Sequence, residues 1–197
     1  YQQTGTGEDG ITAEIVDCKT GFEADYEGKN VAGKIVLVQV DQANESWIDG
    51  YIRQAYQKGA AAVVSYANSG YGELNKDTIN VQDVCCDDLL PTAAISANEA
   101  KKIKKAIKDG NKKATLMIDA VVEKGTGTTY NVVGKIKGKD SDQQTIVSAH
   151  YDKYWFGFQD DSIAIGTVLS MAKALKDSGY EPENDLVFVC HGSEEWG

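Results

Sequence analysis

The stretch AGKIVLVQV at residues 32–40 is an almost unbroken apolar run with the length of one buried strand. Residues 47–58 follow with apolar side chains at helical spacing and stop before Gly59, a residue type that favours the end of a helix. The apolar segment AAAVVSY at residues 60–66 then predicts a second strand. Because strand, helix and strand in succession are typical of a parallel sheet, the sequence indicates an α/β fold.

The neighbouring segments extend this fold into one domain. Ser96 and Glu99 have the spacing of a capping box, which predicts the start of a helix that ends near Gly110. We therefore assign residues 1–122 to a first α/β domain. Its other strands are predicted at residues 11–18, 91–95 and 114–122.

A second domain is expected at residues 123–197. It opens with EKGTGTT, a stretch rich in Gly and Thr that lacks an apolar pattern and is typical of a linker. Because strand, helix and strand follow one another in its later part, we expect a crossover within a parallel sheet. The elements predicted are strands at residues 130–136 and 145–149 joined as a hairpin, a helix at 162–178, and the buried strand DLVFVC at 185–190.

The charge of the chain is acidic and unevenly distributed. Among 197 residues, 30 are acidic and 20 are basic, which gives a net charge of −10. Such an excess disfavours nucleic-acid binding, and the lysines between Lys101 and Lys113 alternate with apolar residues as on a solvated helix face. No apolar run approaches the roughly 18 residues that a membrane span needs.

The acidic pairs and both histidines of the second domain lie beside predicted strand ends. Because the carboxyl ends of parallel strands meet at one edge of a sheet, we expect these side chains to converge. Several carboxylates in a small volume repel one another unless protons or cations neutralise them. An imidazole among carboxylates suits zinc, manganese or iron better than calcium. The residues concerned are His150, Asp152, Asp160, Asp161, His191, Glu194 and Glu195.

Three motifs of this region resemble those of the cocatalytic di-zinc metallopeptidases, which include leucyl-type aminopeptidases and glutamate carboxypeptidase. Residues 1–122 are similar to the protease-associated (PA) domain of many members, with VAGKIVLVQV and KGAAAVVSY at its two core strands. The resemblance implies a swivelling, barrel-like β/α domain followed by the first part of the zinc-exopeptidase α/β sandwich. The motifs are His150-Tyr151-Asp152, residues 157–166 around Asp160-Asp161, and Glu194-Glu195-Trp196-Gly197.

The resemblance also implies a role for each polar side chain. His150 would ligate one zinc ion, and Asp152 would orient its imidazole. Asp160 would bridge two zinc ions and would be followed by a cis peptide bond. Glu195 would ligate zinc, while Glu194 would act as the general base that takes a proton from the bridging water.

The implied function is that of a zinc-dependent exopeptidase, most simply an aminopeptidase that acts on peptides. The resemblance also implies a protein that is secreted or lies at the cell surface. The family uses a further aspartate and a further histidine from later segments, whereas this sequence stops two residues after Glu195. We therefore expect a fragment that is inactive by itself and holds zinc weakly or not at all. We also expect strand 185–190 to be an exposed edge that promotes self-association.

Two other functions fit parts of the sequence. A non-catalytic, receptor-like interaction module with a PA domain would tolerate loss of the zinc ligands, yet the ligand positions that can be checked are intact. A phosphodiesterase would use more histidines than His150 and His191. The segment HGSEE that begins at His191 differs from the inverted zinc motif His-X-X-Glu-His in its last residue, so we expect His191 near the site without a metal role.

Overall fold

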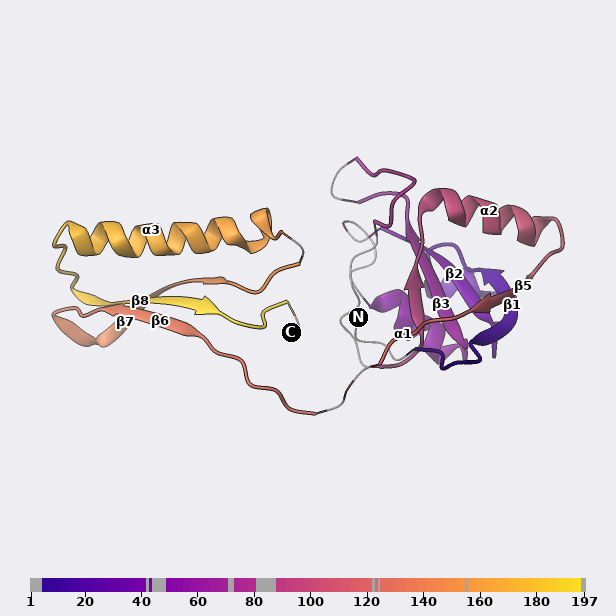
Figure 1. Ribbon diagram of the computed structural model, residues 1–197, viewed down its shortest axis with the longest axis horizontal. Helices are drawn as coiled ribbons and strands as arrows, with labels where there is room; N and C mark the ends of the chain where they lie inside the picture. Colours follow the sequence, from indigo (N-terminus) through magenta and orange to yellow (C-terminus); the bar gives the residue numbers. More distant parts are fainter. Residues whose placement is uncertain are drawn as a thin grey trace. The chain divides into compact units, whose positions relative to one another are not determined.

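The computed structural model of the chain describes residues 5–41, 43, 49–70, 73–80, 88–121, 123, 125–154 and 156–195. The chain divides into two compact units, residues 1–124 and residues 125–197 (Figure 1). Positions 47 and 48 of the first predicted helix and positions 196 and 197 of the last motif lie outside the described residues. Among the described residues, no helix combines the length and apolar character needed to cross a membrane.

The first unit is a mixed sheet with the strand order β4-β3-β2-β1-β5. Its first four strands pair in parallel, and β5 runs antiparallel to β1. The parallel pairing of β2 with β3 confirms the α/β prediction made from the two apolar runs. The strands are β1 (Ile11–Asp17), β2 (Ile35–Val40), β3 (Ala62–Ala67), β4 (Thr92–Ala94) and β5 (Lys113–Leu116).

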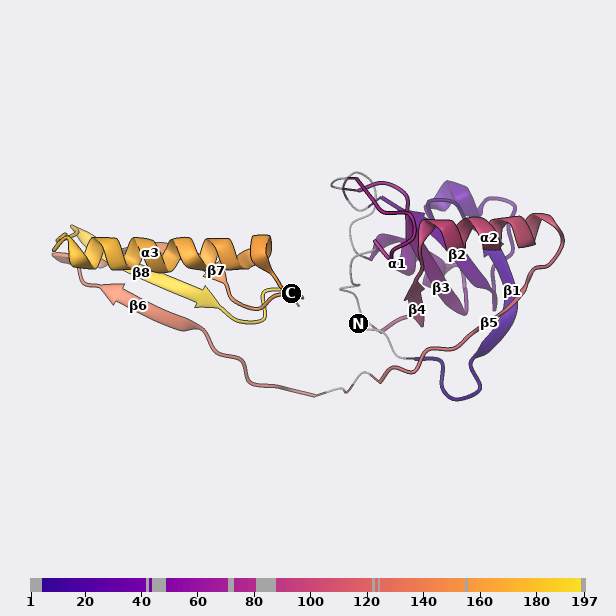
Figure 2. The ribbon, with the colours of Figure 1, turned by 45° about the horizontal axis from the view of Figure 1, so that its top comes forward.

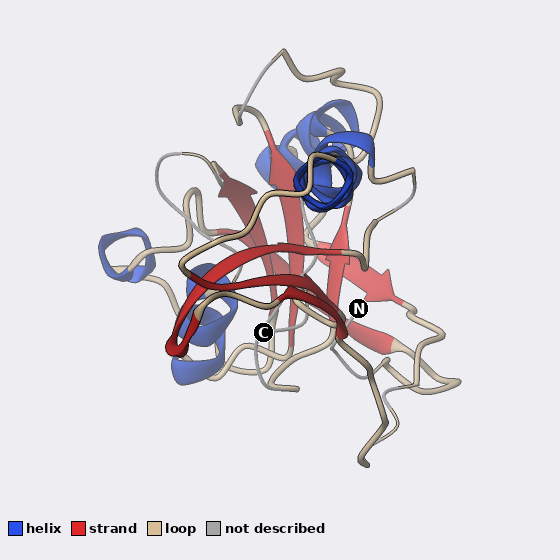
Figure 3. Cartoon of the chain, turned by 90° about the vertical axis from the view of Figure 1, so that its left-hand side faces the viewer, coloured by secondary structure: helices blue, strands red, loops and turns tan. Residues whose placement is uncertain are grey.

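Helices cover both faces of this sheet, which explains why its central strands are apolar throughout. Val36 lies in the apolar cluster of α1 (Gly50–Gln57), whereas Ile35 and Leu37 lie in the cluster of α2 (Ala97–Lys108). Figure 2 labels the two helices with the strands between them, and Figure 3 marks helices and strands of the chain by colour. A short 3₁₀ helix, η1 (Glu23–Tyr26), precedes β2 and was not predicted.

Helix α2 begins at the predicted capping box. The Ser96 hydroxyl accepts a hydrogen bond from the Glu99 backbone N–H at 3.2 Å, and the Ser96 N–H donates to the Glu99 carboxylate at 3.2 Å. These two bonds satisfy backbone donors that no helical carbonyl can reach. Two residues, Ser96 and Glu99, were therefore sufficient to predict the start of this helix.

The second unit is a three-stranded sheet with the order β6-β8-β7 and one helix against it. Helix α3 buries Val168 against Phe188 and Ala149, so the apolar stripe of the helix meets the strands that the sequence predicted. Strand β7 is parallel to β8, whereas β6 is antiparallel to β8. The elements are β6 (Val132–Ile136), β7 (Asp140–His150), α3 (Ile163–Asp177) and β8 (Asn184–His191).

The predicted hairpin between the first two strands of this unit is wrong, because β8 lies between them. Their link passes the start of β8, where the Gly138 N–H donates to Asp185 at 2.8 Å and the Asp140 N–H donates to the Glu183 carbonyl at 2.7 Å. A Cβ at position 138 would collide with the Asn184 backbone, so the crossing requires glycine.

The same arrangement corrects the predicted sheet edge. Strand β8 pairs with β7 from Asn184 to His191 and with β6 from Leu186 to Cys190, so this strand is not an exposed edge. The physical reason is that DLVFVC is the most apolar strand of the unit and gains most from two neighbours. Strands β6 and β7 form the two edges of this sheet.

Candidate metal centre

The candidate site lies at the edge where two parallel strands end together. His150, the last residue of β7, stands opposite His191, the last residue of β8. The Tyr151 N–H donates to the His191 carbonyl at 2.8 Å and extends the pairing by one bond. The loops that follow the two strands therefore leave the sheet side by side, as expected for ligand sites in open α/β sheets.

A third segment reaches this edge from the start of α3. A π-helical turn, η2 (Phe158–Ser162), precedes the helix, and the peptide bond between Asp160 and Asp161 is cis, as the family resemblance implied. The Asp161 carboxylate accepts the backbone N–H of His150 at 3.3 Å, which ties this turn to the end of β7. The turn thereby places both aspartates beside the imidazole.

His150, Asp160 and Glu195 come together as a group that could hold a metal ion. One potential ligand atom from each side chain lies within 4.8 Å of the other two. The closest pair is His150 Nε2 and Asp160 Oδ1, at 2.9 Å. The His150 side chain is only 11% exposed, whereas that of Asp160 is 75% exposed. The group is thus anchored in the fold on one side and open to solvent on the other.

Both ring nitrogens of His150 face oxygen acceptors. Nδ1 lies 2.9 Å from the Asp152 backbone carbonyl oxygen, while Nε2 faces Asp160. Burial lowers the pKa of His150, but the hydrogen bonds to Asp152 and Asp160 and the charges of Glu194 and Asp161 outweigh it, so the pKa is raised. Because a carbonyl oxygen can only accept, Nδ1 keeps its proton, and Nε2 is the nitrogen available to a metal.

The Asp152 carboxylate binds the loop after β8. Its Oδ1 accepts the Glu194 backbone N–H and its Oδ2 accepts the Glu195 backbone N–H, both at 3.1 Å. Partial burial would raise the pKa of Asp152, but these two N–H groups and the charge of His150 hold it below its usual value. Asp152 is therefore ionised and joins two of the segments that form the site.

The carboxylates of the site are crowded in a way that favours a cation. Burial raises the pKa of Glu195, and the charge of Asp160 raises it further, followed by smaller contributions from Glu194 and Asp152 that the charge of His150 opposes. A divalent ion would relieve this repulsion. An imidazole nitrogen with two carboxylates is a donor set that zinc accepts, so these residues fit the metal that the family resemblance implies.

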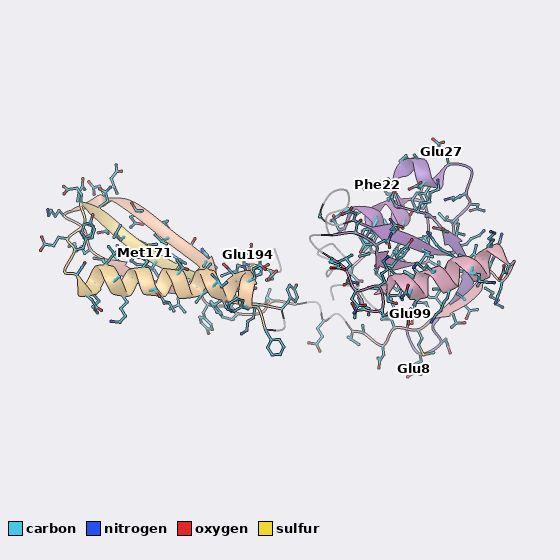
Figure 4. All side chains as sticks on the ribbon, turned by 90° about the horizontal axis from the view of Figure 1, so that it is seen from above. Glu8, Phe22, Glu27, Glu99, Met171 and Glu194 are labelled. Carbon is cyan, nitrogen blue, oxygen red and sulfur yellow. The ribbon has the colours of Figure 1, made fainter. Side chains whose placement is uncertain are left out.

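The remaining predicted residues lie near the group. Glu194 is 59% exposed, and its Oε2 lies 3.7 Å from His150 Nε2. Figure 4 labels this residue near the first turn of α3. His191 lies at the end of β8 and is not among the three grouped side chains. One residue that sequence reasoning missed is Asn131, whose amide oxygen accepts the Gly192 N–H at 3.1 Å.

Comparison with known proteins agrees with this geometry. Residues 131–197 match the model of peptidase family M28, and residues 11–103 match the model of the PA domain. A probable leucine aminopeptidase 2 from Aspergillus fumigatus is 31% identical over 180 residues, which are 89% of this chain and 33% of that protein. Carboxypeptidase Q from Bos taurus is 25% identical over 98% of this chain and 42% of that protein.

Solved structures show the same likeness. An aminopeptidase from Aneurinibacillus sp. strain AM-1 superposes with a TM-score of 0.70 at 29% sequence identity, over 95% of this chain and 45% of that chain. A zinc aminopeptidase from Bacillus subtilis, at 24% identity and a TM-score of 0.72, shares the fold. The chain spans about a third of the length of its fungal relatives.

The chain is an α/β protein with a candidate metal centre. An imidazole and two carboxylates form this centre where β7 and β8 end. This centre lies within the segment at residues 131–197 that matches peptidase family M28, and the segment at residues 11–103 that matches the PA domain precedes it in the sequence.

Proposed function

We propose that the whole protein is a zinc-dependent exopeptidase, and specifically an aminopeptidase that releases the N-terminal residue of peptides. The observation that supports this most directly is the convergence of His150, Asp160 and Glu195 within 4.8 Å at the end of two parallel strands. The matches to family M28 and to proteins named as leucine aminopeptidases also support this proposal.

Each residue of the group has a distinct part in holding zinc. His150 offers Nε2, because its Nδ1 proton is engaged by the Asp152 carbonyl oxygen. Asp160 is the most exposed of the three and is suited to serve two ions, the number that the family resemblance implies, while Glu195 supplies a carboxylate from the opposite loop. Bound zinc supplies Lewis acidity that lowers the pKa of water and polarises a peptide carbonyl.

Glu194 is suited to proton transfer. Its carboxylate is exposed and is not among the three grouped ligands, yet its Oε2 lies only 3.7 Å from His150 Nε2. From there it would take a proton from the attacking water and return it to the nitrogen of the cleaved peptide bond, which leaves as the amino terminus of the shortened peptide. Its backbone N–H is held by Asp152, which keeps the carboxylate beside the metal ligands.

The alternative of a non-catalytic interaction module is not favoured. Such a module would have no need for three ligand side chains drawn from three separate segments. It would also have no need for a partly buried histidine with an oxygen acceptor at each ring nitrogen. The charge crowding around Glu195 would destabilise it without benefit.

The proposed activity is tested on the whole protein with leucine p-nitroanilide and with its N-acetylated form. An aminopeptidase hydrolyses the first and leaves the second intact, because a blocked amine removes the group that defines its substrate. Removal of zinc with a chelator abolishes turnover, and zinc restores it. Release of C-terminal residues from N-blocked peptides, without action on leucine p-nitroanilide, would instead identify a carboxypeptidase. Zinc-independent turnover, or none on either class of substrate, would contradict the proposal.

A further inference from the structure

The loop after β8 is held through its backbone by side chains from the segments next to two other strands. The Gly192 N–H donates to the Asn131 amide oxygen at 3.1 Å. The Glu194 and Glu195 N–H groups donate to the two oxygens of the Asp152 carboxylate, also at 3.1 Å. Asn131 lies immediately before β6 and Asp152 two residues after the end of β7, so the loop is held to the segments next to both strands that flank β8.

The Asp152 carboxylate is nearer to this loop than to the histidine. Its Oδ1 lies 3.5 Å from His150 Nδ1, whereas the backbone carbonyl oxygen of the same residue lies 2.9 Å from that nitrogen. The imidazole is therefore oriented mainly by the main chain at position 152. The side chain at position 152 instead accepts hydrogen bonds from the loop that carries Glu194 and Glu195.

The geometry of the loop leaves little freedom at its first residue. A Cβ at Gly192 would lie 2.6 Å from the Thr129 hydroxyl and 2.7 Å from the Tyr151 hydroxyl. The Tyr151 hydroxyl itself donates to the Tyr130 carbonyl at 2.7 Å. The segment before β6 therefore touches the Gly192 turn directly, which makes the Asn131 contact one member of a packed corner rather than an isolated surface bond.

We propose that Asp152 and Asn131 are positioning residues for the loop Gly192–Glu195, which they hold in the conformation that presents Glu194 and Glu195 to the site. Two separate side chains fix three backbone N–H groups of a four-residue segment. Order that exists before a ligand binds lowers the entropy lost on binding. The consequence for catalysis rests on the proposed function, whereas the positioning itself does not.

The test uses the chain itself, without metal, and the variant Asp152→Asn. Asparagine replaces one of the two accepting oxygens by an NH2 group, which can only donate, and its side chain carries no charge. Amide exchange at Glu194 and Glu195, measured by NMR, is expected to accelerate about tenfold or more. The ¹⁵N shifts of the His150 imidazole are expected to stay as in the natural chain, because the backbone carbonyl is retained. Asp142→Asn, a matched loss of charge near the opposite end of β7, is expected to change neither.

A second pair of variants tests the other anchor. Asn131→Ala removes the acceptor, so amide exchange at Gly192 is expected to accelerate about fivefold, the size of one neutral hydrogen bond. Asn131→Asp keeps an oxygen at the same place and is expected to restore slow exchange. This pair decides the question if Asp152→Asn unfolds the second unit, which fast exchange throughout α3 would reveal.

The opposite results are equally distinct. Unchanged exchange at Glu194 and Glu195 with altered imidazole shifts in Asp152→Asn would show that the carboxylate acts on His150, and the proposal would be wrong. Equal exchange at Gly192 in the alanine and aspartate variants of Asn131 would remove the second anchor. In the whole protein, Asp152→Asn is expected to weaken zinc affinity about 10- to 100-fold. If the protein proved to be no peptidase, the metal-free exchange results would still stand or fall by themselves.

Discussion

His150 Nε2 lies 2.9 Å from Asp160 Oδ1, and this contact joins the last residue of β7 to the turn before α3. The ring is 11% exposed and its other nitrogen is engaged by the Asp152 carbonyl oxygen, so the imidazole has little freedom to turn away. Without metal, a proton on Nε2 holds the pair together. If zinc binds as proposed, the same two atoms would become neighbouring ligands, so protons and zinc would compete for His150 Nε2.

Glu195→Gln is expected to have opposite effects on stability and on metal binding. The pKa of Glu195 is raised in the folded chain, chiefly by burial and by the charge of Asp160. An acid with a raised pKa destabilises the fold as pH rises from its usual value of 4.5 through the folded value. At neutral pH and with a chelator present, the glutamine variant therefore unfolds at a higher denaturant concentration than the natural chain. Its zinc affinity falls.

The control for that experiment is Glu181→Gln, because Glu181 is an exposed acid of the same unit that lies outside the group of ligands. It is expected to leave both quantities unchanged. A lower unfolding midpoint for Glu195→Gln in the absence of metal would show that the carboxylate crowding is not a cost to the fold.

Glu194→Gln is expected to reduce kcat of the whole protein without loss of zinc. A general base contributes roughly 10²- to 10⁴-fold to such a reaction, and an amide cannot take the proton. KM is expected to change little, because the backbone N–H that holds Glu194 to Asp152 is retained. Steady-state kinetics together with the zinc content of the purified variant measure this. A variant with full kcat would remove Glu194 from the proton-transfer role.

Asp185 is expected to make the second unit sensitive to acid. Its buried carboxylate accepts a hydrogen bond from Lys135 Nζ and another from the Gly138 N–H, both at 2.8 Å, and these hold its pKa below the usual 3.8. A lowered pKa contributes stability that is present above the unfolded value and is lost as pH falls through the folded value. The difference in unfolding free energy between the natural chain and Asp185→Asn should therefore be full at pH 6 and shrink steadily below about pH 4. A difference that is constant with pH would contradict the ion pair.

Ser96→Ala is expected to destabilise the first unit by about 1 kcal/mol, the typical cost of removing a helix N-cap side chain. Ser96 is buried and takes part in both bonds of the capping box. Denaturant unfolding of the first unit measures the change, and the double variant with Glu99→Ala shows whether the two residues act as a pair. Strictly additive effects of the two substitutions would argue against the reciprocal cap.

Local patterns in the sequence were sufficient for most elements of the fold. The run at residues 35–40 became β2 because burial on both faces selects apolar residues throughout. Helix α2 began where a capping box predicted it. The pairing of strands was harder, because it depends on contacts distant in the sequence. The two strands before α3 read as a hairpin, yet the more apolar β8 took the place between them.

Part of the site could be predicted from the sequence, and the rest could not because it depends on contacts distant in the sequence. The convergence of His150, Asp160 and Glu195 follows from a general property of parallel sheets and could be expected from the sequence alone. Asn131 could not, because it acts through one amide oxygen on one backbone N–H. A single polar residue ahead of a strand leaves no periodic pattern and no motif by which to find it. The contact of Asp152 with the following loop was hidden in the same way.

Zinc binding by the group of His150 Nε2, Asp160 and Glu195 is followed most directly through the imidazole ¹⁵N resonances of the chain during a zinc titration. We expect Nε2 of His150 to lose its proton and shift as zinc reaches millimolar concentration, while Nδ1 keeps its proton. His191, which stands opposite on β8, serves as the internal control and is expected to remain unchanged. A His150 ring that does not respond to zinc, or a response at His191 instead, would contradict the account.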